Sequence, residues 1–305
     1  MERQKLAEIW GNVQQLMSAG GTHYGEAVQQ AIQDVGMESL QLGLLLHVFQ
    51  FEPESIRAHE LQRIIPYYAT EPFEEGFQQL AAHGFLEGKH SSYTLSEKGR
   101  QALITIFGAA TEKLAEVEQH LPSNTLQPLH DLLKGLNEEA ENNQEIAEKL
   151  CFDMQNHCVP TTLNSKLSDI GDFVSNLYGF RCDCHRHAWQ QLDYVLDGPT
   201  WEALTAIWQG DANSVKTITE HRLNARPTRG FGEDVYAKSL EKLLRYGWIE
   251  VEDTDQETYR LTETGKSVRD DAENETDRLF YSIWSALDEA DLAQLNTLSQ
   301  LVVEA

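Results

Sequence analysis

The stretch Leu240 to Gly265, LEKLLRYGWIEVEDTDQETYRLTETG, decides the expected fold class of this chain. Its first part has apolar residues at helical spacing and reaches Gly247, a residue suited to the left-handed turn that ends a helix. Trp248 to Val251 favours a strand, and Tyr259 to Leu261 brings the chain back. Thr262 then stands where a helix N-cap is needed. The predicted order is therefore helix, two-stranded hairpin and helix.

An earlier stretch, Phe77 to Gly99, FQQLAAHGFLEGKHSSYTLSEKG, has the same order. Gly84 and Gly247 differ by 163 positions (247 − 84), and Gly99 and Gly265 by 166 (265 − 99). The two offsets differ only across the hairpin tip, where an insertion costs little. A repeat of whole supersecondary units predicts that the chain contains two structurally similar parts. We therefore predict a mainly α fold with small β-wings, made of two winged-helix units flanked by long helices and pseudo-dimeric within one chain. A generic helix followed by a hairpin is the simpler alternative.

The repeat also predicts where the chain divides. We expect residues 1–149 to hold N-terminal helices, the first winged helix and C-terminal helices, and residues 150–305 to hold a helix, the second winged helix and C-terminal helices. Residues 1–35 have a helical apolar stripe that the pair Gly20-Gly21 is expected to break.

Composition indicates a cytoplasmic protein. The 305 residues include 49 acidic and 24 basic side chains, a net charge of −25 that repels nucleic acid at long range. No apolar run is long enough to span a membrane, and the N-terminus lacks an apolar signal core. The four cysteines are not spaced like a secreted disulfide framework, which favours reduced thiols.

The segments Leu95 to Gly99, LSEKG, and Leu261 to Gly265, LTETG, resemble the Leu-Thr-x-x-Gly that follows the wing in MarR-type winged-helix transcription regulators. The chain looks like a duplicated or fused version of such a unit. The resemblance implies a dimer-like core of terminal helices, with small ligands bound between that core and the DNA-reading parts. The second half also resembles a bacterial helix-turn-helix group through Phe180 to Trp189 and Glu275 to Trp284, and that group has no activity to carry over.

Charge distinguishes the two candidate reading heads. The first head, Ser55 to Gly84, has 2 basic and 4 acidic residues (2 − 4 = −2), and the second head, Ser214 to Arg245, has 7 and 4 (7 − 4 = +3). The second head is the better DNA candidate, with loop residues at phosphates and helix lysines in the groove. The predicted DNA-binding residues are Arg222, Arg226, Thr228, Arg229, Lys238 and Lys242. The alternative is a solvated face of exposed ion pairs, and the acidic second tip, Glu252 to Glu257, opposes the usual minor-groove contact of the family's wing.

A cluster of thiols and imidazoles marks a second candidate site. Cys182, Cys184, His185 and His187 fall within six residues, and side chains of these types hold zinc. Neighbours two positions apart on a helix point to different sides, however. Buried cysteines and surface histidines are the alternative.

Together these patterns predict a MarR-like transcriptional regulator that binds double-stranded DNA mainly through the second winged helix and responds to a small ligand. The alternatives are a winged-helix protein-interaction module with an acidic surface, and a metal or thiol sensor. No cofactor is expected, zinc being the exception under the last alternative. No nucleophile elbow, phosphate-binding glycine loop or paired-histidine motif is present, so we expect no enzymatic activity.

Overall fold

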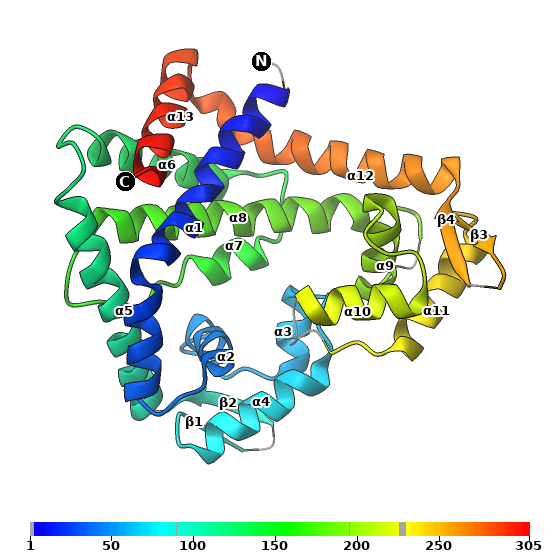
Figure 1. Ribbon diagram of the computed structural model, residues 1–305, viewed down its shortest axis with the longest axis horizontal. Coiled ribbons are helices and arrows are strands. Elements are labelled where there is room, and N and C mark those ends of the chain that lie inside the picture. The colour runs from blue at the N-terminus through cyan, green and yellow to red at the C-terminus, as the bar shows by residue number, and fades with distance from the viewer. Residues whose placement is uncertain (1–2, 90, 195, 226–229, 256) are drawn as a thin grey trace. The chain divides into compact units, whose positions relative to one another are not determined.

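The computed structural model describes residues 3–89, 91–194, 196–225, 230–255 and 257–305 (Figure 1). Within these residues the chain is mainly helical and has two small antiparallel sheets. The helices of the first half are α1 (Arg3–Asp34), α2 (Ser39–Gln50), α3 (Ala58–Ile64), α4 (Thr70–Ala82), α5 (Glu97–Glu118) and α6 (Leu126–Asn142). Those of the second half are α7 (Leu150–Gln155), α8 (Lys166–Gln190), α9 (Gly198–Gln209), α10 (Val215–Ala225), α11 (Glu233–Arg245), α12 (Glu263–Ser282), the short 3₁₀ helix η2 (Ile283–Ala286) and α13 (Glu289–Val303). None of the helices described is both long and apolar enough to cross a membrane.

Each sheet is a hairpin between two helices. In the first, β1 (Leu86–Lys89) pairs with β2 (Ser92–Leu95), and Leu86 lies opposite Leu95. In the second, β3 (Ile249–Asp253) pairs with β4 (Thr258–Leu261), and Ile249 lies opposite Leu261. Both hairpins follow three helices and precede a long one, so the same order of elements occurs at α2 to α5 and at α9 to α12 (Figure 1).

Equivalent hydrogen bonds join each hairpin to the helices on either side of it. At the first junction (Gly84, Phe85, Ser96 and Gly99), Ser96 Oγ accepts from the Gly99 amide at 3.0 Å and donates to the Gly84 carbonyl at 2.7 Å. The second junction (Gly247, Trp248, Thr262 and Gly265) has the same bonds from Thr262 Oγ1, at 3.1 and 2.7 Å.

Glycine is required at the start of both following helices. A Cβ on Gly99 would lie 2.1 Å from the Phe85 carbonyl oxygen, and one on Gly265 would lie 2.0 Å from that of Trp248. Backbone cannot move away as a flexible side chain does, so only glycine fits at either position.

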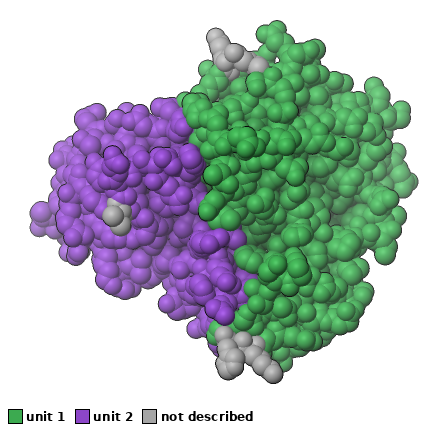
Figure 2. Space-filling view, turned by 180° about the vertical axis from the view of Figure 1, so that it is seen from behind, with its two compact units in different colours: residues 1–55, 79–184, 277–305 green, residues 56–78, 185–276 purple. Residues whose placement is uncertain are grey.

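The described chain forms two compact units (Figure 2). Unit 1 comprises residues 1–55, 79–184 and 277–305, and unit 2 comprises residues 56–78 and 185–276. Unit 1 has a large apolar core in which Trp10 packs against Phe280 and Trp284. The core of unit 2 is built around Trp201 and Trp248. Each unit takes segments from both halves of the chain, and the expected division into residues 1–149 and 150–305 stays a prediction.

Helix α1 is continuous through Gly20-Gly21, and its buried apolar stripe stops at Leu16 and resumes at Ala31, so the expected break in the stripe is present without a break in the helix. A glycine inside a helix costs only about 1 kcal/mol, which tertiary packing of an apolar face can offset. Here Leu6, Ile9 and Val13 of α1 are buried in the unit 1 core. A Cβ on Gly20 would come within 3.9 Å of the Leu114 side chain of α5, so the glycine lies where the two helices approach closely.

Candidate nucleic-acid interface

The second head contains α10 and α11, which pack with α9 around a buried aromatic centre. Helix α9 begins after Asp197, whose carboxylate accepts from the Thr200 amide at 2.9 Å, and ends at Gly210 with φ of 75°. Trp201 of α9 and Tyr236 of α11 are almost completely buried. Because the apolar face of α11 faces this core, its polar face is left to solvent.

The polar face of α11 presents three cations. Lys238, Lys242 and Arg245 follow one another at intervals of four and three residues, so they share one side of the helix. Lys238 is 73% exposed and lies 3.6 Å from Asp234. Arg245 is exposed, and no carboxylate of the described residues lies within ion-pair distance of it. A helix face of this kind is suited to phosphate and groove contacts.

Lys242 is tied to the start of α9 and is therefore less available than Lys238. Its ammonium forms an ion pair with Asp197, the N-cap of α9. Burial raises the pKa of Asp197, but hydrogen bonds from Lys242 and Thr200 outweigh it and leave the pKa below its ordinary value. A phosphate contact by Lys242 would have to replace this pair.

Arg222 faces the interior of the second head. Its guanidinium lies 3.5 Å from the carboxylate of Glu202, and its side chain is only 14% exposed. The hydroxyl of Tyr236 donates to the same carboxylate at 2.6 Å. This geometry gives Arg222 a structural partner, and its predicted phosphate contact stays a prediction.

Three of the predicted DNA contacts, Arg226, Thr228 and Arg229, lie outside the described residues. The described chain resumes at Gly230, which has φ of 66°. A Cβ on Gly230 would lie 2.3 Å from the ring of Pro72, at the start of α4. The segment just before α11 therefore packs on the beginning of α4 within unit 2.

The hairpin that follows α11 is acidic. Glu250 on β3 pairs with Arg260 on β4 at 2.8 Å, and both side chains are at least half exposed. Glu252 and Asp253 continue β3 towards the tip with no basic residue beside them in the sequence. Carboxylates here would repel DNA phosphates, so the face of α11 is a better candidate than the hairpin.

The thiol and imidazole cluster does not form a metal centre in the part of the chain that the structure describes, where no three His, Cys, Asp or Glu side chains gather to hold an ion. Cys184 is buried in the apolar core, and burial raises the pKa of its thiol. His185 Nδ1 forms a hydrogen bond with the Thr276 hydroxyl at 3.2 Å, and His185 Nε2 accepts a hydrogen bond from the Trp201 indole N–H at 2.9 Å. The zinc site predicted at Cys182, Cys184, His185 and His187 thus has no support from the geometry.

The thiol alternative has no better support at Cys158, an exposed residue whose sulfur is itself partly shielded and lies against Asp172. Burial of the sulfur and the charges of Asp172 and Asp169 raise the pKa of Cys158 to about 12, and its thiol is bonded to Asp172. A thiolate is the reactive form of cysteine, so this thiol is poorly suited to redox sensing.

Two features of the second head escape sequence reasoning. Glu202 is an acidic residue inside the apolar pattern of α9, which is the only sequence signal for its bonds to Arg222 and Tyr236. The pairing of Asp197 with Lys242 joins residues 45 positions apart and has no local signal.

Residues 173–305 match a helix-turn-helix family. The matched region contains α9, the second head with α10 and α11, and the β3–β4 hairpin. Comparisons with curated proteins and with solved structures returned no match. A helix-turn-helix domain suggests DNA binding or a regulatory role, and the expected helix-turn-helix character of the second half is confirmed.

Proposed function

We propose that the chain is a MarR-like transcriptional regulator that binds double-stranded DNA through the second head. The observation that carries this proposal is the match of residues 173–305 to a helix-turn-helix family, which includes α11 with its cationic face. In the proposed arrangement α9 to α12 and α2 to α5 are two winged-helix units, related as a tandem repeat. The equal bonding at the two junctions supports that reading.

Binding is proposed to use Lys238 and Arg245 at the groove and Arg226 and Arg229 at flanking phosphates. Lys242 joins them only when its pair with Asp197 opens. The first head has a packing role in this proposal, since Phe73 and Phe77 are buried and their rings stack 6.5 Å apart. The proposal includes a cytoplasmic location, and it assigns the chain no enzymatic activity and no cofactor.

A second candidate function is an interaction module for a basic protein. It is favoured by the way carboxylates hold the second head's cations, since Lys216, Arg222, Lys238 and Lys242 each lie within 4 Å of one. The acidic hairpin and the net charge of −25 point the same way. An acidic surface speeds association with a basic partner and slows it with DNA.

The test is fluorescence anisotropy with the purified full-length chain, using labelled duplex from upstream of its own coding region and a random duplex, each across a salt series. We expect tighter binding to the upstream duplex and a loss of affinity as salt rises, because phosphate contacts release counterions. The double variant Lys238→Ala/Arg245→Ala should weaken binding by about tenfold or more.

Lys134→Ala provides the matched control. Lys134 on α6 forms an exposed i,i+4 pair with Glu138 at 3.4 Å, as Lys238 does with Asp234, but lies outside the second head. It should leave DNA affinity within about twofold of the parent. Equal losses of DNA affinity in the two variants would indicate a general charge effect. Absence of DNA binding even at low salt would reject the proposed regulator and favour the interaction module.

A further inference from the structure

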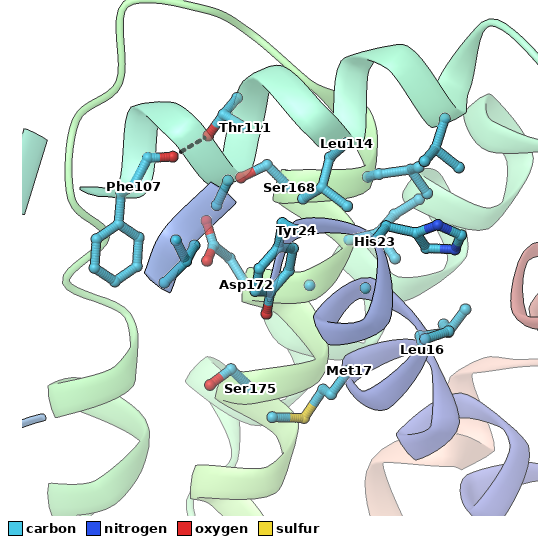
Figure 3. Close-up of a pocket in the computed structure, with 18 of the residues that line it drawn as sticks. Leu16, Met17, His23, Tyr24, Phe107, Thr111, Leu114, Ser168, Asp172 and Ser175 are labelled. Carbon is cyan, nitrogen blue, oxygen red and sulfur yellow. Dashed lines mark hydrogen bonds between the residues drawn. The ribbon is translucent and has the colours of Figure 1, made fainter. Parts of the chain in front are cut away.

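Unit 1 contains an apolar cavity of about 330 Å³, a volume within the range of small-molecule sites (Figure 3). Its walls come mainly from α1, α5 and α8, with Leu42 of α2 and Val302 of α13 completing them. The α8 wall combines Leu167 and Ile170 with a stripe of small and polar residues at helical spacing, Ser168, Gly171, Asp172 and Ser175. Because the side chains of this stripe are small, they leave space beside α8 that larger side chains would fill.

Asp172 is the single carboxylate among the residues that line this cavity, and the lining contains no lysine or arginine. In Figure 3 its carboxylate lies beside the ring of Tyr24, and His23 is on the other side of that ring. Burial raises the pKa of Asp172 to about 6, with the charge of Asp169 adding to it and the hydrogen bond from Cys158 opposing it.

An ionised Asp172 weakens the fold on its own. Among the described residues, no lysine, arginine or histidine forms an ion pair with it, and a half-buried charge without a counter-charge is costly. Its raised pKa means that the folded state binds the proton more tightly than the unfolded state, so stability falls as pH rises from about 4 to about 6. A carboxylate that destabilises its own apolar site is a candidate for a binding role.

We propose that this cavity binds a lipophilic organic cation, an amine or quaternary ammonium with an apolar group attached. The cationic centre lies beside Asp172 and against the face of Tyr24, and the apolar group fills the space bounded by Leu16, Phe107 and Leu114. The ligand supplies the positive charge that the protein does not, and the aromatic ring adds a cation–π contact. This binding does not depend on the proposed DNA binding.

Charge selects a cation over an anion. An anion would meet Asp172 inside the cavity, Asp169 one turn earlier on α8 and an overall charge of −25, all of the same sign. A neutral alcohol can bond to the carboxylate but leaves its charge uncompensated. The ranking expected for probes of one size is therefore cation, then alcohol, then carboxylate.

Isothermal titration calorimetry of the full-length chain at pH 7.5, without DNA, tests the proposal with benzyltrimethylammonium, benzyl alcohol and benzoate as probes. We expect one cation to bind per chain, at least about tenfold more tightly than the alcohol, and no binding of benzoate. Asp172→Asn should weaken binding of the cation by about tenfold or more. Because the variant loses an uncompensated charge, it should melt at a higher temperature than the parent at pH 7.5 and at the same temperature near pH 4, which also shows that it folds.

Two further variants separate the cavity from general charge effects. Asp169→Asn removes an equal charge from the neighbouring turn, outside the lining, and should change the affinity by less than about threefold. Gly171→Leu places a side chain where a Cβ has no neighbour within 4 Å, so it should fill the cavity and abolish binding.

Affinity for the quaternary probe, whose charge is independent of pH, should fall as pH drops through about 6. The titratable groups near Asp172 are Tyr24 and His23 of α1, Asp169 of α8 and Cys158, while the α5 wall contributes none. The proposal is overturned if the cation does not saturate in the millimolar range, if benzyl alcohol binds as tightly, or if Asp169→Asn weakens binding as much as Asp172→Asn. These outcomes leave the DNA-binding result untouched, because no step of the titration uses DNA.

Discussion

The first and second junctions share their backbone chemistry, whereas the surfaces around them differ. At both, a hydroxyl caps the following helix and bonds back to the glycine carbonyl, and a second glycine packs on a carbonyl oxygen. Around the second junction are the cations of α11 and an acidic hairpin, while residues 55–84 before the first have a net charge of −2.

This contrast separates what packing demands from what function selects. Close backbone approach leaves no freedom at Gly99 and Gly265, so both junctions need the same residue. Solvent-exposed charges cost the fold little and can differ freely between the surroundings of the two junctions. DNA binding, if it resides in one head, must therefore be sought in the exposed charges and not in the shared junction.

The largest effect is expected from the glycines. Gly99→Ala and Gly265→Ala should each lower the free energy of unfolding by about 2–4 kcal/mol, because the added methyl meets a backbone oxygen at close to 2 Å. Urea unfolding followed by circular dichroism measures both. Gly108→Ala in α5, where a Cβ meets nothing within 4 Å, is the control and should gain about 0.5–1 kcal/mol. A loss of stability at only one junction would show that the two glycines are not required for the same reason.

The capping hydroxyls should differ in degree. Ser96 is buried and Thr262 is only partly so. Ser96→Ala should therefore cost about 2 kcal/mol and Thr262→Val about 1 kcal/mol, since an unsatisfied amide or carbonyl is more costly where water cannot replace the lost bond. Equal losses in urea unfolding would show that burial does not distinguish the two caps.

A smaller effect belongs to the second head alone. Asp197→Asn keeps an N-cap for α9 but loses the charge that pairs with Lys242, so it should cost about 0.5–1 kcal/mol at pH 7. The pKa of Asp197 is lowered in the folded state, so the stabilisation is present above the carboxyl's unfolded pKa and disappears as pH falls through the folded one. Unfolding at pH 7 and near pH 3 should show a smaller difference between variant and parent at the lower pH. A Lys242→Met background should remove the difference at pH 7, and an unchanged difference there would contradict the pairing.

The smallest effect is expected at the second hairpin. Arg260→Gln breaks an exposed pair with Glu250 and should change the free energy of unfolding by at most about 0.5 kcal/mol. Arg100→Gln, next to the first junction, should cost about 1 kcal/mol, because Arg100 holds Glu52 with two hydrogen bonds and Glu52 is mostly shielded. Thermal unfolding measures both variants. Equal losses of stability in Arg260→Gln and Arg100→Gln would show that exposure does not distinguish the two ion pairs.

Much of the local structure was predictable because its causes are local. The helix ends at Gly84 and Gly247, the hairpins and the caps at Ser96 and Thr262 follow from glycine conformation, strand propensity and hydroxyl capping. The apolar stripe of α1 is interrupted around Gly20-Gly21 as expected, and the helix stays continuous there because packing of α1 in the core outweighs a weak local preference.

The candidate sites were less predictable because they combine distant segments. Lys238 was chosen from its sequence position; its side chain is exposed, and its DNA contact stays a prediction. The inward turn of Arg222 onto Glu202 was not foreseen, since it depends on how α9 and α10 pack. Nor was the cavity at Asp172, which needs α1, α5 and α8 together.

By itself the sequence determined the helix and hairpin order, the glycines and caps of the two junctions, and the acidic character of the chain, because each depends on neighbouring residues or composition alone. Only the tertiary structure decided which cations hold structural carboxylates, how cysteines and histidines separate, and that Asp172 faces an apolar cavity. The physical reason is that burial and ion pairing depend on distances between segments far apart along the chain, which local propensity does not specify.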